Sequence, residues 1–124
     1  MRTLLLTLAL ATGLSTMAQQ KGQTEKTPAE KAKNRTEWMT KELGLDATQQ
    51  EKVAAINLQY AQAMQNVDAI KDETSRKGRA SALKTSRDNN LQSVLTPQQY
   101  DKMIKVREER KAKKSAAKAA KGRK

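Results

Sequence analysis

The chain has 124 residues, with no Cys, no His and no Phe, and its 25 Lys or Arg against 13 Asp or Glu give a formal net charge of +12. The lack of Cys and His excludes disulfide bonds, thiol or imidazole catalysis and the usual ligands of zinc and copper. With few large side chains to bury, such a chain is better stabilised by helix pairing within a dimer than as a lone globule.

The first 18 residues have the three-part pattern of a secretory signal peptide. Arg2 provides the positive start, residues 4–14 are mostly apolar, and Thr16-Met17-Ala18 places small residues at a cleavage site. This apolar stretch is shorter than the about 20 residues that a membrane-spanning helix needs. We therefore expect cleavage near Ala18 and export from the cytoplasm.

Composition divides the rest of the chain into three segments. Residues 19–26 are polar and lack apolar periodicity, which predicts a flexible leader. Residues 27–109 carry helical patterns and are expected to form the helical domain. Residues 110–124 contain eight Lys or Arg and no acidic residue. Because like charges repel, we expect this Lys/Ala-rich tail to be disordered or transiently helical until an anionic partner neutralises it.

Three capping boxes mark the starts of helices. They lie at Thr27-Pro28-Ala29-Glu30, at Asp46-Ala47-Thr48-Gln49 and at Thr96-Pro97-Gln98-Gln99. In this motif the first side chain accepts a hydrogen bond from the backbone N–H three residues later, and the Glu or Gln there reaches back to the first residue's N–H. Two of the boxes also have Pro at the first helical position, where its missing N–H costs nothing.

Apolar residues spaced by three and four predict helices, and no segment alternates as a strand would. The first helix should span 28–43 and stop at Gly44, a favourable residue after a helix end. The second carries a heptad-like stripe over 53–70. We expect a bend or break within the polar residues 72–79, which include Gly78, and a weaker stripe over 80–95, before the third capping box opens a last helix. The fold class is therefore all-α with about four helices.

Two of the capping boxes share a longer pattern of Leu, cap, two spacers and Gln, over residues 45–49 and 95–99. Here the chain resembles the Spy/CpxP-like family of bacterial periplasmic proteins, whose mark is a repeated LTxxQ motif. The first copy has Asp where the family prefers Thr, a change that the capping role tolerates. The resemblance covers about residues 27–110. The motif residues are Leu45, Asp46, Gln49, Leu95, Thr96 and Gln99.

The resemblance implies an elongated helical hairpin that pairs antiparallel with a second chain in a cradle-like periplasmic homodimer. Members include ATP-independent chaperones that hold unfolding clients on a basic, partly apolar concave face. Other members are stress-sensing adaptors that contact a sensor kinase. Zinc binding, which some relatives achieve through histidines, is not carried over because this chain has none.

Candidate client contacts combine Met side chains with positive charge. Met adapts its shape to varied partners, and positive charge raises the capture rate of acidic or partly unfolded chains. The alternative for the Met residues is burial in the helical core, and for the charged residues it is a solvated face. The candidates are Met39, Met64, Arg76, Lys77, Arg79, Lys84, Arg87 and Met103.

Two other functions stay open. Tight binding of one envelope partner would make the protein an adaptor, which also needs only a helical face. The tail looks like the Lys-rich tails of linker histones and could bind a polyanion, such as nucleic acid, lipopolysaccharide or anionic lipid. Export and the scarcity of aromatic residues argue against an intracellular nucleic-acid role. The candidate polyanion contacts are Arg110, Lys111, Lys113, Lys114, Lys118, Lys121, Arg123 and Lys124.

Catalysis is not expected from this sequence. It has no phosphate-binding Gly-rich loop and no nucleophile or metalloprotease motif. The adjacent carboxylates Asp72-Glu73 and Glu108-Glu109 would point about 100° apart on a helix and would not converge on a substrate. We therefore expect no cofactor, no metal and no small-molecule substrate.

Overall fold

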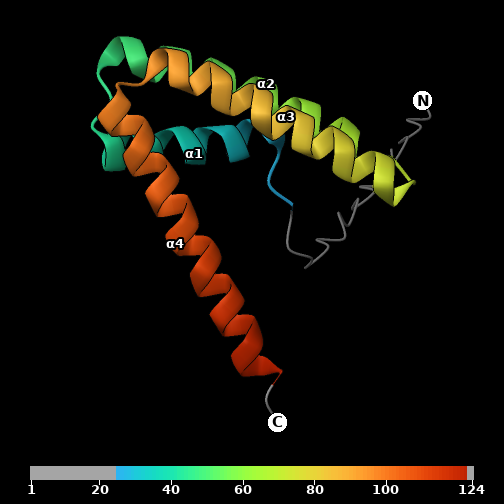
Figure 1. Cartoon of the computed structure of the whole chain (residues 1–124). Coiled ribbons are helices and arrows are strands. Elements are labelled where there is room, and N and C mark those ends of the chain that lie inside the picture. Colours follow the sequence, from blue (N-terminus) through green and yellow to red (C-terminus); the bar gives the residue numbers. More distant parts are fainter. Residues whose placement is uncertain (1–24, 123–124) are drawn as a thin grey trace, which may run out of the picture.

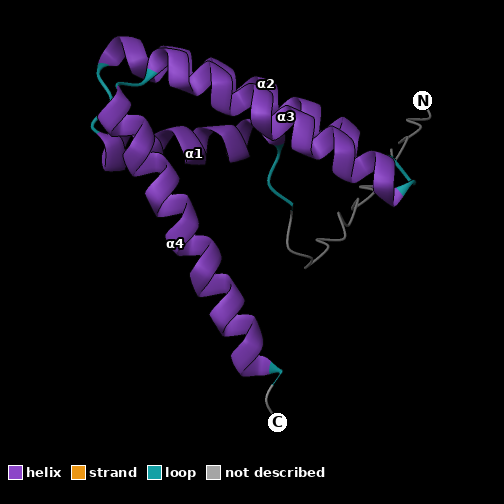
Figure 2. Ribbon diagram, viewed as in Figure 1, coloured by secondary structure: helices purple, strands orange, loops and turns teal. Residues whose placement is uncertain are grey.

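The computed structural model describes residues 25–122, which form an all-α fold without strands in that range (Figures 1 and 2). The predicted signal peptide, residues 19–24 of the leader, and Arg123 and Lys124 lie outside the described residues. None of the helices in the described range combines the length and the apolar character that crossing a membrane requires. The helices are α1 (Pro28–Leu43), α2 (Ala47–Asp68), α3 (Glu73–Val94) and α4 (Pro97–Lys121).

The helices form a long hairpin with one shorter and one diverging arm. α1 packs along α2, and α2 packs along α3. α4 contacts α1 and α3 and then projects away from them (Figure 1). The α1–α2 and α3–α4 loops lie together at one end of the hairpin, and the α2–α3 turn lies at the other (Figure 1). This arrangement leaves an angle between α4 and the remaining helices.

All three capping boxes are formed. At α1 the Thr27 hydroxyl accepts from the backbone N–H of Glu30 at 3.2 Å, and the Glu30 carboxylate accepts from the N–H of Thr27 at 2.8 Å. Asp46 and Gln49 exchange the same bonds at 2.7 and 3.1 Å. α1 ends before Gly44, whose φ of 66° lies in the left-handed region that favours glycine.

The bend or break expected within residues 72–79 lies at the very start of that range and not at Gly78. The chain turns at residues 69–72, and Gly78 lies inside α3 without interrupting it. α3 begins at a fourth cap, where the Asp72 carboxylate accepts from the N–H of Ser75 at 2.8 Å. A single Gly costs a helix about 1 kcal/mol relative to Ala, which flanking turns can absorb. A cap with a carboxylate acceptor therefore outweighs one Gly in setting the boundary.

α4 continues through most of the segment that the charge pattern predicts to be disordered. Residues 110–121 are helical, and every described side chain from 108 to 122 is exposed. Ala and Lys favour helix, which opposes the repulsion among the charges. Disorder of this segment in the free chain stays a prediction.

The core lies at the end of the hairpin that holds the two loops. Leu45 and Leu95, one from each repeated motif, are both buried in it. Trp38 and Tyr100 are half-buried against the cluster. The buried apolar residues of the cluster are Met39, Leu43, Leu45, Val53, Leu91, Leu95 and Met103.

Candidate functional site

The side chains of Gln49 and Gln99 bond to each other and join the two repeated motifs. The Gln49 amide nitrogen donates to the Gln99 side-chain oxygen at 2.8 Å and to the Val94 carbonyl at 3.2 Å. The Gln99 amide nitrogen donates to the Gln49 side-chain oxygen and to the Leu43 carbonyl, both at 3.2 Å. Each glutamine thus also satisfies a carbonyl at the end of the helix preceding the other motif. We call this pair the glutamine clasp.

The clasp gives the Gln of the motif a second role besides capping. The oxygen of Gln99 accepts from the backbone N–H of Thr96 at 3.0 Å, while its nitrogen bonds across the loops. A Glu could make the first bond but not the second. Glu30, which closes the first capping box, makes no side-chain hydrogen bond to another helix or loop among the described contacts. Sequence reasoning found the caps and missed the pairing between them.

Two guanidinium groups, those of Arg87 and Arg107, bind the carboxylate of Asp88, and a third, that of Arg35, lies within range of their charges. Asp88 accepts from Arg107 Nη1 at 2.7 Å, from Arg107 Nη2 at 3.1 Å and from Arg87 Nε at 3.1 Å. Burial by itself would raise the pKa of Asp88, but the bonds from Arg107 and the charge of Arg87 outweigh it and hold the pKa below its usual value. Arg87 is buried and lies over the Tyr60 ring, 4.3 Å from the centroid.

The positive charge of the third guanidinium, that of Arg35, is poorly compensated by negative charge. Burial, followed by the positive charges of Arg87 and Arg107, lowers the pKa of Arg35 to about 10. Its Nε atom is buried and has no hydrogen-bond partner among the described residues. Three positive charges therefore share the single negative charge of Asp88, and this part of the fold carries an excess of positive charge.

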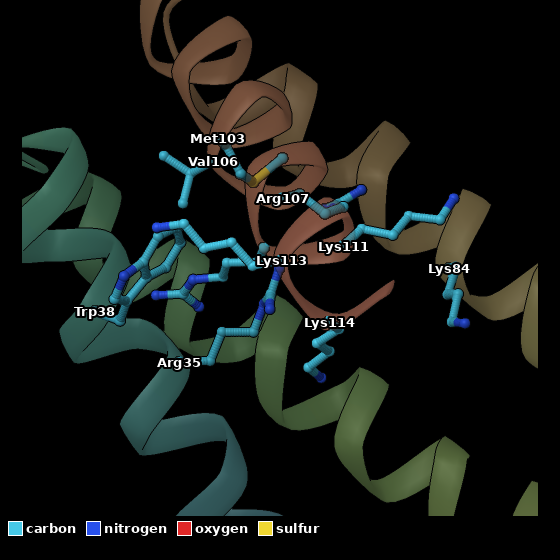
Figure 3. A pocket seen from close by; sticks show the side chains of 10 residues that line it. Arg35, Trp38, Lys84, Met103, Val106, Arg107, Lys111, Lys113 and Lys114 are labelled. Atoms are coloured by element: carbon cyan, nitrogen blue, oxygen red, sulfur yellow. The ribbon is translucent and has the colours of Figure 1, made fainter. Parts of the chain in front are cut away.

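A basic hollow of about 640 Å³ opens between α1, α3 and α4 (Figure 3). Its lining contains seven cationic side chains and no carboxylate, and its apolar part is made by Trp38, Met103 and Val106. The Arg110 guanidinium lies over the Trp38 ring, 4.4 Å from the centroid. The cationic residues of the basic hollow are Arg35, Lys84, Arg107, Arg110, Lys111, Lys113 and Lys114.

The predicted client contacts do not form one surface. Met39 and Met103 are almost fully buried in the core, so neither presents much surface to a client. Lys84 is exposed and lines the basic hollow. Arg87 is engaged with Tyr60 and Asp88, as described above.

The other members of that set lie toward the α2–α3 turn. Arg76 donates to the Ile70 carbonyl at 3.1 Å and thereby closes the end of α2. Lys77 pairs with Glu73 at 2.8 Å on the surface of α3. Met64 is half-buried on α2, and Arg79 is exposed on α3.

The predicted polyanion contacts divide between the basic hollow and the outer end of α4. Four of them line the hollow, namely Arg110, Lys111, Lys113 and Lys114. Lys118 and Lys121 are exposed on α4 and do not line the hollow. The sequence reasoning missed Arg35, Trp38 and Arg107. The signal for the first two was their spacing of three residues, which places both on one face of α1.

The described residues contain no group of three or more His, Cys, Asp or Glu side chains that could hold a metal ion. Fold and site define a small, basic, all-helical protein in which a repeated motif joins two helix pairs beside a cationic hollow. Residues 17–121 match the model of a family described as a domain of unknown function (DUF4890), and the chain belongs to that family. No curated protein and no solved structure matches the chain.

Proposed function

We propose that this protein is an exported, ATP-independent, chaperone-like protein that holds unfolding or partly folded envelope proteins in the basic hollow. The supporting observation is that the basic hollow joins seven cationic side chains to an apolar surface of Trp38 and Val106, which are both half-buried. A partly unfolded chain exposes apolar and acidic groups together, and this surface complements both. The resemblance of the two Leu-to-Gln motifs to Spy/CpxP-like proteins supports the same function.

The physical properties of the hollow suit transient binding. It is open to solvent and offers only a small apolar area, so one client segment would be held weakly and released without ATP. The cationic rim would attract acidic chains over long range and raise their association rate. Binding should therefore weaken as the salt concentration rises.

The proposal includes export to the periplasm and a homodimer. The signal-peptide pattern supports the first. The exposed side chains of α4 from residue 108 to residue 122 support the second, because they offer helix surface for a second chain (Figure 1). Cell fractionation tests the periplasmic location. Light scattering of the protein as it elutes from a size-exclusion column gives its mass and so tests the homodimer.

The function is tested by the scattering of an aggregating client in the presence of the protein, without ATP, at low and high salt. We expect suppression at low salt and weaker suppression at high salt. The apolar contribution is tested with Val106→Ser, which makes one half-buried apolar residue of the hollow polar. Its control is Leu58→Ser, which changes an exposed apolar residue of α2 outside the hollow.

Suppression that Val106→Ser weakens and Leu58→Ser leaves intact supports client binding in the basic hollow. Equal effects of the two variants would place client binding elsewhere. A several-fold excess of protein that leaves aggregation unchanged would refute general chaperoning. Purification of one tight partner from envelope extracts would then support the adaptor function.

A further inference from the structure

We propose that the basic hollow is a binding site for a multivalent phosphate-bearing anion. The inference goes beyond client binding and does not depend on it, because it follows from the charge balance of the described fold. It assigns to the hollow a ligand with two or more phosphoryl groups, held by side chains from three helices. The same phosphate chemistry occurs in soluble oligophosphates and in phosphorylated lipid head groups.

The first argument is the number of cations without a partner. Arg87 and Arg107 both pair with Asp88, whose single negative charge neutralises only one of their two positive charges. Within residues 25–122, Arg35 and Lys84 form no ion pair. The same holds for the three α4 lysines of the hollow, Lys111, Lys113 and Lys114. A monovalent carboxylate would leave most of this charge unbalanced, whereas an anion with several phosphoryl groups would neutralise it.

The second argument is the convergence of these side chains. Arg35 comes from α1, Lys84 from α3 and the lysines from α4, and Figure 3 shows them around one opening. Residues from separate helices can surround a compact ligand, which a row of charges along one helix cannot do. The volume of about 640 Å³ lies within the range of small-ligand sites, ~300–1,000 Å³.

The third argument is the state of Arg35. Its buried Nε has no hydrogen-bond partner in the described range, and its charge lies close enough to those of Arg87 and Arg107 to be repelled by them. A guanidinium presents several N–H donors in a planar fork that matches phosphate oxygens. A bound phosphoryl group would supply both the missing acceptor and the missing negative charge. An acidic peptide would supply only one negative charge per carboxylate.

The test measures tripolyphosphate binding to the full chain at constant ionic strength. Trp38 is the only Trp of the chain and lines the hollow beside Arg110, so its fluorescence should report occupancy. The test variant, Lys84→Gln with Lys114→Gln, removes two exposed lysines of the hollow. The control, Lys118→Gln with Lys121→Gln, removes two exposed lysines of α4 outside it and gives the same net charge.

We expect saturable binding of tripolyphosphate that raises the melting temperature. The test variant should weaken the affinity about tenfold or more and the control about twofold or less, since direct charged contacts are lost only in the first. Equal losses in both variants would overturn the proposal in favour of diffuse attraction to α4. An unchanged Trp38 signal and melting temperature at millimolar tripolyphosphate would also overturn it.

A second arm identifies the source of the phosphate. Phosphatidylcholine vesicles with and without phosphatidic acid are mixed with the same proteins, and co-sedimentation is measured. Binding that needs phosphatidic acid and is lost only in the test variant assigns the hollow to lipid phosphate. Saturable binding of tripolyphosphate without vesicle binding assigns it to a soluble oligophosphate. Client aggregation is measured separately, so a failure of client binding leaves this result interpretable.

Discussion

Replacing Gln99 by Glu should destabilise the fold although the capping box survives. The new carboxylate can still accept from the backbone N–H of Thr96 and from the Gln49 amide, as the Gln99 oxygen now does. It can no longer donate to the Leu43 carbonyl and the Gln49 side-chain oxygen, each now 3.2 Å from the Gln99 nitrogen. Instead, a negative oxygen would lie against both acceptors.

The expected loss follows from counting these bonds. Two net hydrogen bonds contribute about 2 kcal/mol together, and the new repulsion between oxygens adds to the loss. A negative charge in the first turn of α4 gains about 0.3–1 kcal/mol from the helix dipole, which offsets part of it. We expect a net destabilisation of about 2 kcal/mol, and therefore a melting temperature lower by about 8–16 °C for a domain of this size.

The assay is thermal and urea unfolding followed by circular dichroism. The matched control is Glu30→Gln, the reverse exchange, in the capping box whose Glu makes no hydrogen bond to another helix or loop. It should cost about 0.5 kcal/mol or less. The loss in the Gln99 variant should also shrink toward pH 4, as the introduced carboxyl takes up a proton and regains a donor. Equal losses in the two variants would refute the role assigned to the clasp.

Further changes test the charges and polar groups around the core. Asp88→Asn should cost about 1–3 kcal/mol of folding stability. The lowered pKa of Asp88 stabilises the folded state above the unfolded pKa near 4, and this stabilisation is lost as the pH falls through the folded pKa. The stability of the Asn variant should therefore depend less on pH below about pH 4. Asn57→Leu should raise the melting temperature, since the Asn57 side-chain oxygen is buried without a partner in the described range. Arg35→Met should also raise it, by removing a buried charge whose pKa is lowered to about 10, while weakening tripolyphosphate binding. If the tail is disordered in solution, a chain that ends at Glu109 should show almost the same helical circular dichroism as the full chain. The loss should be smaller than the signal of twelve helical residues.

Helix starts could be predicted from the sequence because capping is local. The three boxes need only residues three apart, and each opens a helix where the sequence placed it. The start of α3 was missed because Ser75 follows the Asp72 cap where a box would have Glu or Gln. Fold class followed from the same local signals together with the apolar spacing.

The candidate site could not be predicted because its contacts connect distant positions. The clasp joins residues fifty apart in the chain, and the hollow joins Arg35 and Trp38 to the start of the tail. Charge alone assigned the lysines of α4 to a separate, disordered segment. Only the angle at which α4 leaves the hairpin brings them opposite α1 and α3 (Figure 1).

The positive charge of the hollow is more than the fold itself requires. Arg107 has a structural partner in Asp88, and Arg87 has both Asp88 and Tyr60. Arg35 has no such partner in the described residues, although it lies beside a core in which an apolar side chain would pack without an electrostatic cost. A local conflict of this kind is expected at a binding site, where the ligand completes what the fold leaves uncompensated. Arg35 is therefore the residue at which stability and ligand binding should respond in opposite directions to one substitution.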